Sequence, residues 1–279
     1  MFHLLGSLTL VAAMLIGARR YGARRMAFPA LIPLLLSMAA PFQWVLMSAP
    51  LIGWLAAVQV ERGRSYGDAI AAASIPGAGL GLLLLGALHG EMLPTRDLVD
   101  SWVPALQEVG TEAPLPDTVS LEQLVETMLA VLPGTAYLSL LMVAVLGYRV
   151  AEAVGPRFGT QVPAAVPLHR WRLWETLIWA LIVCLAMSFL ADEGLISGLA
   201  VNGLLVLSVL YAVQGLAVAR WLMRRMQVQR FLEVLVYALL VFTSGVSVLA
   251  LAGIGLMDTW FDWRRLGHRR HGDAVSQPN

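Results

Sequence analysis

Residues 194–219 read GLISGLAVNGLLVLSVLYAVQGLAVA, contain no charged residue and decide the fold. A helix rises 1.5 Å per residue, so this run is long enough to cross a bilayer core of about 30 Å. Residues 69–88, 127–148 and 234–257 are equally free of charge, and residues 176–191 form a fifth apolar run. These runs predict an all-α, polytopic transmembrane protein.

The composition of the whole chain agrees with this prediction. Of 279 residues, 58% are hydrophobic and 13% charged, and the mean hydropathy is +0.73. Soluble domains carry roughly 25% charged residues. The formal charge of +1 without a basic face argues against a nucleic-acid partner. Every one of the 19 basic residues is arginine, which excludes Schiff-base and P-loop chemistry because both need a lysine amine.

The charge-free run at residues 26–60 is too long for one membrane helix. Proline removes a backbone donor and clashes with the preceding turn, so we expect Pro41 to mark a break. This predicts a spanning helix near residues 42–60 and a shorter helix before it. Residues 2–18 are expected to form a retained first helix.

The expected domain organisation follows from these segments. We expect seven or eight hydrophobic helices, of which the last six form a core. Residues 1–265 are predicted to be a single transmembrane domain, and residues 266–279 a polar, disordered tail. The single cysteine, Cys184, lies inside an apolar run and allows no intrachain disulfide.

Arginine counts in the loops predict the orientation, because translocated loops are poor in arginine. Residues 91–126 hold eight acidic residues and one arginine, whereas residues 149–172 and 220–230 hold four arginines each. This places residues 91–126 outside and the two arginine loops inside. One further crossing would put the arginines at 264–270 outside, against the same rule. Either the last hydrophobic run does not fully cross, or the core runs the opposite way.

The acidic segment at residues 91–119 is expected to lie outside the bilayer. Leu98, Trp102 and Leu106 recur at helical spacing, which predicts an amphipathic helix over residues 95–109 lying in the membrane interface. A lid over an external cavity is the alternative. Ser120 followed by Gln123 predicts a capping box that opens the next helix.

Small residues recur every four positions in two hydrophobic segments. At that spacing they line one face of a helix and allow close backbone approach in lipid. The two interpretations are packing within the chain and docking of a partner membrane protein. The first stripe consists of Ala69, Ala73, Gly77 and Gly81, and the second of Ala49, Gly53 and Ala57.

The sequence contains no recognised catalytic motif, and we expect no enzymatic activity, cofactor or metal site. Polar side chains at membrane depth are more informative, because each costs free energy unless it finds a partner. Asn202 and Gln214, the latter followed by Gly215, are the candidates in residues 194–219. They are expected to make either interhelical hydrogen bonds or ligand contacts.

The densest polar and aromatic cluster is GLMDTWFDWRR at residues 255–265. Its two aspartates lie one helical turn apart at a helix C-terminus, where the macrodipole disfavours carboxylates. We therefore expect one of them to pair with Arg265 or with an arginine of the 220–230 loop. The residues singled out in the cluster are Gly255, Asp258, Trp260, Phe261, Asp262, Arg264 and Arg265, and the loop candidates are Arg220, Arg224 and Arg225.

Residues 204–265 resemble the YybS-like family of predicted bacterial membrane proteins, a family of unknown function. The resemblance rests on YAVQGLA at 211–217, the arginine loop and apolar helix that follow, and the pattern Gly-x-x-Asp-x-Trp-Phe-Asp-Trp-Arg at 255–264. Members are similar in layout to substrate-binding subunits of energy-coupling-factor vitamin transporters and to the shape-determining protein MreD. The resemblance implies a six-helix membrane fold and no particular ligand.

These observations lead to two alternative functions. The first is a non-enzymatic subunit of the bacterial cytoplasmic membrane that binds a small molecule, or helps to move one, together with partner proteins. The second is an MreD-like envelope scaffold that assembles other membrane proteins. Because the chain has no nucleotide-binding sequence, another polypeptide would have to power any active transport.

Overall fold

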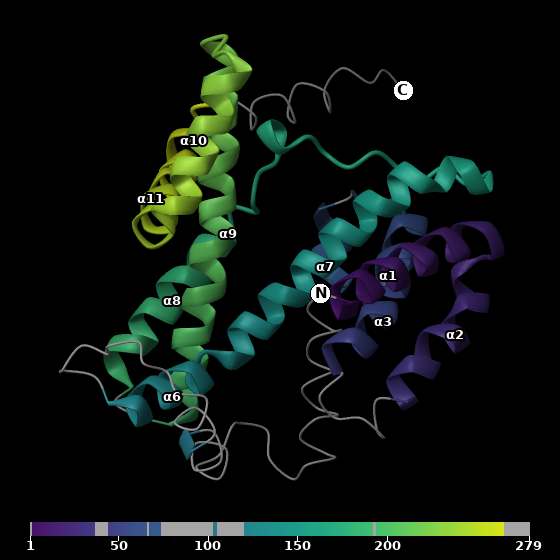
Figure 1. Ribbon diagram of the computed structural model, residues 1–279, viewed down its shortest axis with the longest axis horizontal. Coiled ribbons are helices and arrows are strands. Elements are labelled where there is room, and N and C mark those ends of the chain that lie inside the picture. The colour runs from purple at the N-terminus through teal and green to yellow at the C-terminus, as the bar shows by residue number, and fades with distance from the viewer. Residues whose placement is uncertain are drawn as a thin grey trace, which may run out of the picture. The chain divides into compact units, whose positions relative to one another are not determined.

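The computed structural model describes residues 2–36, 44–65, 67–73, 103–104, 120–191 and 194–264 (Figure 1). All regular elements within these residues are helical. The chain forms two compact units, Met1–Ala165 and Val166–Asn279, and each is described by itself. The expectation of one transmembrane domain over residues 1–265 stays a prediction.

The first unit begins with three helices in the expected order. They are α1 (Phe2–Tyr21), α2 (Ala23–Leu36) and α3 (Trp44–Glu61). Gly22, with φ of +90°, separates α1 from α2, a conformation that glycine adopts without steric cost. The long charge-free run is thus divided between α2 and α3, and the residues around Pro41 lie outside the described ones.

The second half of this unit contains α6 (Leu121–Ala130), α7 (Leu132–Val154) and the short 3₁₀ helix η3 (Gly155–Phe158). The capping box predicted before α6 is confirmed: Ser120 Oγ accepts from the Gln123 N–H, and the Gln123 side chain accepts from the Ser120 N–H. The predicted amphipathic helix over residues 95–109 lies outside the described residues except for Val103 and Pro104. Val103 packs against Val125 and Leu129 of α6.

The core of the first unit forms where α1 packs against both α3 and α7 (Figure 1). Gly53 of α3 lies against the backbone of Val11, and Gly147 of α7 lies against the Val11 side chain. Glycine is required at this contact, because a Cβ at position 53 would come within 2.9 Å of the Val11 carbonyl oxygen. Close approach of three helices around Val11 therefore depends on two residues without side chains.

The described members of both small-residue stripes are buried inside this unit. Ala49 and Ala57 of α3, and Ala69 and Ala73 in the helical residues 67–73, are all 0% exposed. They belong to the core that α1, α3 and α7 share. Gly77 and Gly81 lie outside the described residues. The structure thus shows packing within the chain for the described part of each stripe.

The second unit contains η4 (Leu168–Arg170), α8 (Leu177–Leu190), α9 (Leu195–Arg225), α10 (Arg230–Phe242) and α11 (Ser244–Phe261). The long helix α9 packs mainly against α11 and α8. Cys184 of α8 lies directly against Gly203 of α9, because Gly203 has no side chain that would occupy the place of the Cys184 sulfur.

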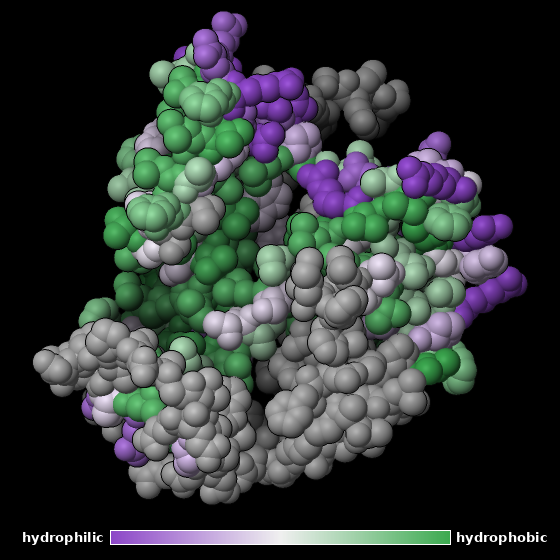
Figure 2. Space-filling model, in the orientation of Figure 1, coloured by the Kyte–Doolittle hydropathy of each residue, from purple (hydrophilic) through white to green (hydrophobic). Residues whose placement is uncertain are grey.

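Two spans predicted in this unit differ in the structure. The run at 176–191 forms only the 14 residues of α8, about 21 Å at the usual rise, which is shorter than the bilayer core. The run at 234–257 is not one straight helix, because the chain bends by 112° between α10 and α11. Figure 2 shows mostly hydrophobic side chains over the visible faces of these helices.

Two helices among the described residues are long and apolar enough to cross a membrane, Leu132–Phe158 and Ile196–Arg225. The bent pair of α10 and α11 would make a third if it were one span. Seven or eight hydrophobic helices were expected, and that count is not confirmed. Most of the expected span at 69–88 lies outside the described residues.

Candidate functional site

A buried polar network joins α9, α11 and the segment before α8. Its centre is Gln214 of α9, which is 0% exposed. The Gln214 side-chain oxygen accepts from the Leu173 N–H at 3.1 Å, and Nε2 donates to the Gly255 carbonyl at 3.0 Å. The same Nε2 lies 3.2 Å from both Asp258 Oδ2 and Thr259 Oγ1. One amide side chain thus links three segments that are far apart in the sequence.

Asp258 and Arg264 add an ion pair to this network, and both side chains are fully shielded from solvent. Arg264 Nη2 and Nε donate to Asp258 Oδ2 at 2.6 and 3.1 Å. Arg264 Nη1 donates to the carbonyls of Trp171, at 2.8 Å, and His169, at 3.3 Å. Buried charges are tolerated when they are paired and hydrogen-bonded, and this guanidinium meets both conditions.

The end of α11 brings Arg264 back to Asp258. Asp262 ends the helix with φ of +41°, in the left-handed region, while its N–H still donates to the Asp258 carbonyl. Aspartate tolerates this conformation better than most residues. The reversal turns the chain over the last helical turn, so a residue six positions later reaches the Asp258 carboxylate.

A second and more exposed pair lies beside the first. Arg172 donates to Asp262 Oδ1 at 3.3 Å and to the Thr259 carbonyl at 3.4 Å, and lies 3.1 Å from Glu175. Arg172 and Arg264 thus both tie the segment before α8 to the end of α11. Both side chains of the Arg172–Asp262 pair keep some solvent contact.

Two glycines let α9 and α11 approach closely enough for these bonds. A Cβ at Gly215 would collide with the Leu251 carbonyl, and a Cβ at Gly255 would collide with the Tyr211 carbonyl. The helices therefore meet backbone to backbone beside Gln214. This is the geometry that small residues permit in membrane helix pairs.

The residues of this network lie largely within one family match. Residues 96–259 match the family described as "Predicted membrane protein (DUF2232)", more than half of the chain. The chain belongs to the DUF2232 family. The family description supports a membrane protein and assigns no function. No curated protein and no solved structure matches the chain.

Membership in DUF2232 confirms that part of the expectation which concerned a membrane protein family of unknown function. The similarity to YybS-like proteins, to transporter subunits and to MreD stays a prediction. The match contains Gln214 and Asp258 and ends at residue 259, before Arg264. The bacterial origin and the cytoplasmic membrane also stay predictions.

The structure shows how the described residues of the C-terminal cluster pair. Asp258 pairs with Arg264, and not with an arginine of the 220–230 loop. The pair with Arg264 was not predicted because the turn at Asp262 cannot be read from helical spacing, and a pair between Asp262 and Arg265 stays a prediction. Arg265 lies outside the described residues. Trp260 and Phe261 are exposed, and the Phe261 ring stacks on Trp263 with centroids 6.2 Å apart.

The polar candidates of α9 differ in their surroundings. Asn202 Nδ2 donates to the Gly198 carbonyl of its own helix at 2.8 Å, whereas Gln214 bonds to other segments. The sequence did not indicate the segment at residues 169–173, which supplies backbone partners to both Gln214 and Arg264. The only feature of this segment that could have indicated a role was its two arginines, Arg170 and Arg172, and the chain contains 17 other arginines.

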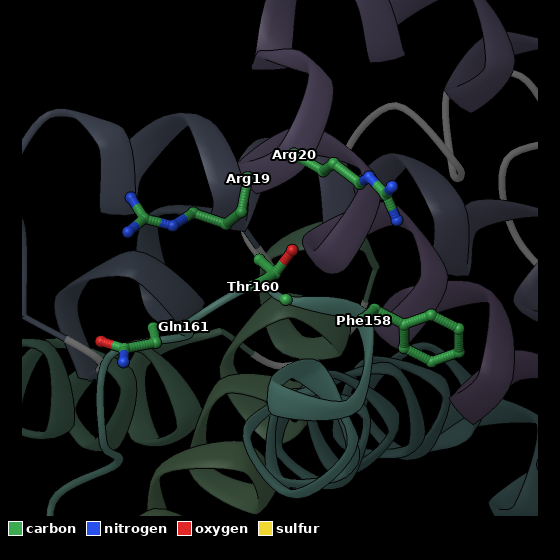
Figure 3. A pocket seen from close by; sticks show the side chains of 6 residues that line it. Arg19, Arg20, Phe158, Thr160 and Gln161 are labelled. Carbon is green, nitrogen blue, oxygen red and sulfur yellow. The ribbon is translucent and has the colours of Figure 1, made fainter.

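A separate pocket lies in the first unit, at the end of α1. Its volume is about 420 Å³, and Arg19, Arg20, Phe158, Gly159, Thr160 and Gln161 line it. Figure 3 shows the Arg19 and Arg20 side chains leaving α1 in opposite directions, with the Thr160 hydroxyl between them. Gln161 lies on the Arg19 side and the Phe158 ring on the Arg20 side.

The turn after α7 shapes the floor of this pocket. The Thr160 N–H donates to the Gly155 carbonyl at 3.1 Å, and Gly159 closes the turn with φ of +67°. A Cβ at Gly155 would come within 2.8 Å of the Thr160 carbonyl oxygen, so glycine allows the tight return. The hydroxyl and the amide lie in an open depression with one guanidinium on either side, and each of these groups can donate hydrogen bonds to an anion that lies on its own side.

Sequence reasoning missed this pocket. Arg19 and Arg20 follow the first apolar run and read as an ordinary membrane exit. Thr160 and Gln161 are unremarkable polar residues of a loop. Only the packing of α7 along α1 brings the turn after α7 to the end of α1.

Proposed function

We propose that this protein is a non-enzymatic membrane subunit that binds a small anionic molecule and works together with partner proteins. The observation that supports the proposal is the pocket at the end of α1. A hydroxyl and an amide, with an arginine on either side, line an open depression of about 420 Å³, which has room for a small ligand. Arginine binds carboxylate and phosphate groups through charge-assisted hydrogen bonds.

The position of the pocket agrees with a binding role in a membrane protein. It lies where α1 and α7 end. Arg24 follows in the first turn of α2, and Arg62 and Arg64 follow the end of α3. An excess of arginine at helix ends is typical of the cytoplasmic face. We therefore expect the ligand to enter from the cytoplasm.

The scaffold alternative rested on the small-residue stripes. The described residues of both stripes face the interior of the first unit and offer no surface to a partner. The polar network around Gln214 is filled by protein groups, so we propose the Arg19–Arg20 pocket, and not Gln214, as the ligand site. We therefore favour ligand binding at the Arg19–Arg20 pocket over an assembly role.

Titration of the detergent-purified protein with pyrophosphate and with succinate tests the proposal. We expect saturable binding of at least one of the two anions. The double variant Arg19→Gln, Arg20→Gln should weaken it by about tenfold or more, because the loss of even one charge-assisted bond costs about 1.5–3 kcal/mol. Arg64→Gln, an exposed arginine outside the pocket, is the matched control and should bind like the parent. Equal weakening by both variants, or no binding of either probe, would contradict the proposal.

A further inference from the structure

Helix α10 has the two faces of a helix that lies at a membrane surface. The large side chains that recur at helical spacing are strongly exposed: Phe231, Val234, Leu235, Leu239 and Phe242. The polar side chains point elsewhere, since the Tyr237 hydroxyl donates to Glu233 at 3.1 Å and Arg220 lies 3.8 Å from Glu233. Such a segregation is typical of amphipathic helices that bury one face in lipid.

The length of α10 excludes a crossing by this helix alone. Its 13 residues rise about 20 Å, whereas the bilayer core is about 30 Å thick. After it the chain bends by 112° into α11. The bend places Phe242, Val246 and Leu249, each more than 70% exposed, around the break.

Thr243 and Ser247, at the break, have hydrogen-bonded backbone N–H and hydroxyl groups, which lowers the cost of placing them in an apolar environment. The Thr243 N–H and hydroxyl both bond to the Leu239 carbonyl, at 2.9 and 2.8 Å. The Ser247 N–H donates to the Thr243 carbonyl at 2.9 Å, and the two hydroxyls lie 2.5 Å apart. The turn is therefore compatible with burial in hydrocarbon.

The residues before α10 and after α11 lie close together. Arg224, at the end of α9, contacts the His169 ring at 3.3 Å, and Arg264 donates to the His169 carbonyl at 3.3 Å. Two guanidinium groups that share one residue cannot lie on opposite sides of a bilayer about 30 Å thick. The two ends of the α10–α11 pair thus belong to one face.

Tryptophan side chains lie near the end of α9, just before α10, and near the end of α11. Trp221 lies under the Arg225 guanidinium in the last turns of α9, at 5.4 Å. Trp260 and Trp263 flank the end of α11, both partly exposed and next to Arg264. Tryptophan and arginine together are typical of the headgroup region.

We propose that α10 and α11 form a re-entrant hairpin, which enters and leaves the bilayer at the face that carries the arginine turns. The exposed apolar side chains of α10 and of the break contact lipid acyl chains. The Gln214–Asp258–Arg264 network fixes the returning end of the hairpin to α9. This arrangement removes the conflict in the arginine counts, because residues 220–230 and Arg264 then lie on the same side.

Cysteine accessibility tests the hairpin in the full-length protein. In a Cys184→Ala background, single cysteines replace Gln229, at the start of α10, Ser276, beyond α11, and Ser197, in the first turn of α9. Each variant is treated with a membrane-impermeant maleimide in right-side-out and in inverted membranes. We expect Gln229→Cys and Ser276→Cys to label in the same preparation and to lose labelling in the other. Ser197→Cys should show the opposite pattern, because it lies in the first turn of the 31-residue helix α9 and Arg225 lies at the other end.

Two labelling results would contradict the hairpin. Labelling of Gln229→Cys and Ser276→Cys from opposite sides would overturn the hairpin and establish a full crossing. Protection of Gln229→Cys in both preparations, with labelling after solubilisation, would also overturn the hairpin, because the start of α10 would then lie inside the bilayer and not at the face that carries the arginine turns. The anion-binding proposal concerns the first unit, so neither result depends on it.

Discussion

Asp258 is the residue on which the second unit depends most. Its Oδ2 accepts from Arg264 and Gln214, and its Oδ1 is buried with no hydrogen-bond partner among the described residues. The carboxylate therefore relies on Arg264 for compensation of its charge. Loss of one member of a buried pair is far more costly than loss of an exposed pair, because the remaining charge stays in a low-dielectric site.

We expect Asp258→Asn to destabilise the second unit by about 3–5 kcal/mol, because it leaves Arg264 buried without a counter-charge. Asp262→Asn is the matched control. It removes a partly exposed pair and keeps a side chain that tolerates the left-handed conformation, so about 1 kcal/mol or less should be lost. Thermal unfolding in detergent compares the two. Equal losses of stability in the two variants would show that the buried pair of Asp258 matters no more than the more exposed pair of Asp262.

His169 gives the network a dependence on pH. Burial and the nearby guanidinium groups of Arg224, Arg170, Arg220 and Arg264 lower its pKa below the usual 6.5. The unfolded chain therefore binds the proton more readily, and stability should fall as the pH drops below about 6.5. Melting temperatures measured from about pH 8 to about pH 5 check this. The non-titrating variant His169→Asn should lose this part of the pH dependence, and an unchanged profile would rule the effect out.

At the scale of elements, the contact between α9 and α11 depends on Gly215 and Gly255. Each faces a carbonyl of the other helix with no space for a methyl group. The sequence showed Gly215 next to Gln214 and Gly255 in an apolar run, and gave no sign that the two glycines face each other. Their pairing follows from how the two helices cross.

Gly253, in the same helix, is the control for a substitution of Gly255. Gly255→Ala should cost about 1–3 kcal/mol, because the added methyl group pushes the Tyr211 backbone away. At Gly253 a Cβ would meet nothing within 4 Å, so Gly253→Ala should be neutral or stabilising by up to about 1 kcal/mol. Chemical denaturation in detergent would measure both. A loss at Gly253 as large as at Gly255 would indicate a general effect on the helix.

For the whole molecule, the orientation of the acidic segment stays a prediction. Residues 91–126 carry eight acidic residues and a single arginine, which favours the external face. In a Cys184→Ala background, Ser101→Cys should therefore react with an impermeant maleimide in intact cells. Reaction only after lysis would reverse the topology of the entire chain and place the Arg19–Arg20 pocket on the outside.

The sequence by itself determined the class of the protein and the approximate position of many helices. Charge-free runs, the capping box at Ser120 and small residues at four-residue spacing are local signals, because the cost of burying polar groups in lipid acts on each segment separately. It also identified Gln214 and Asp258 as polar groups that need partners.

Only the tertiary structure decided which partners they have. Arg264 reaches Asp258 because the chain reverses at Asp262, and Leu173 reaches Gln214 because the segment before α8 lies against α9. The pocket at Arg19 and Thr160 likewise joins residues far apart in the chain. Such pairings depend on turns and helix crossings, which are set by packing between segments and leave no periodic trace in the sequence.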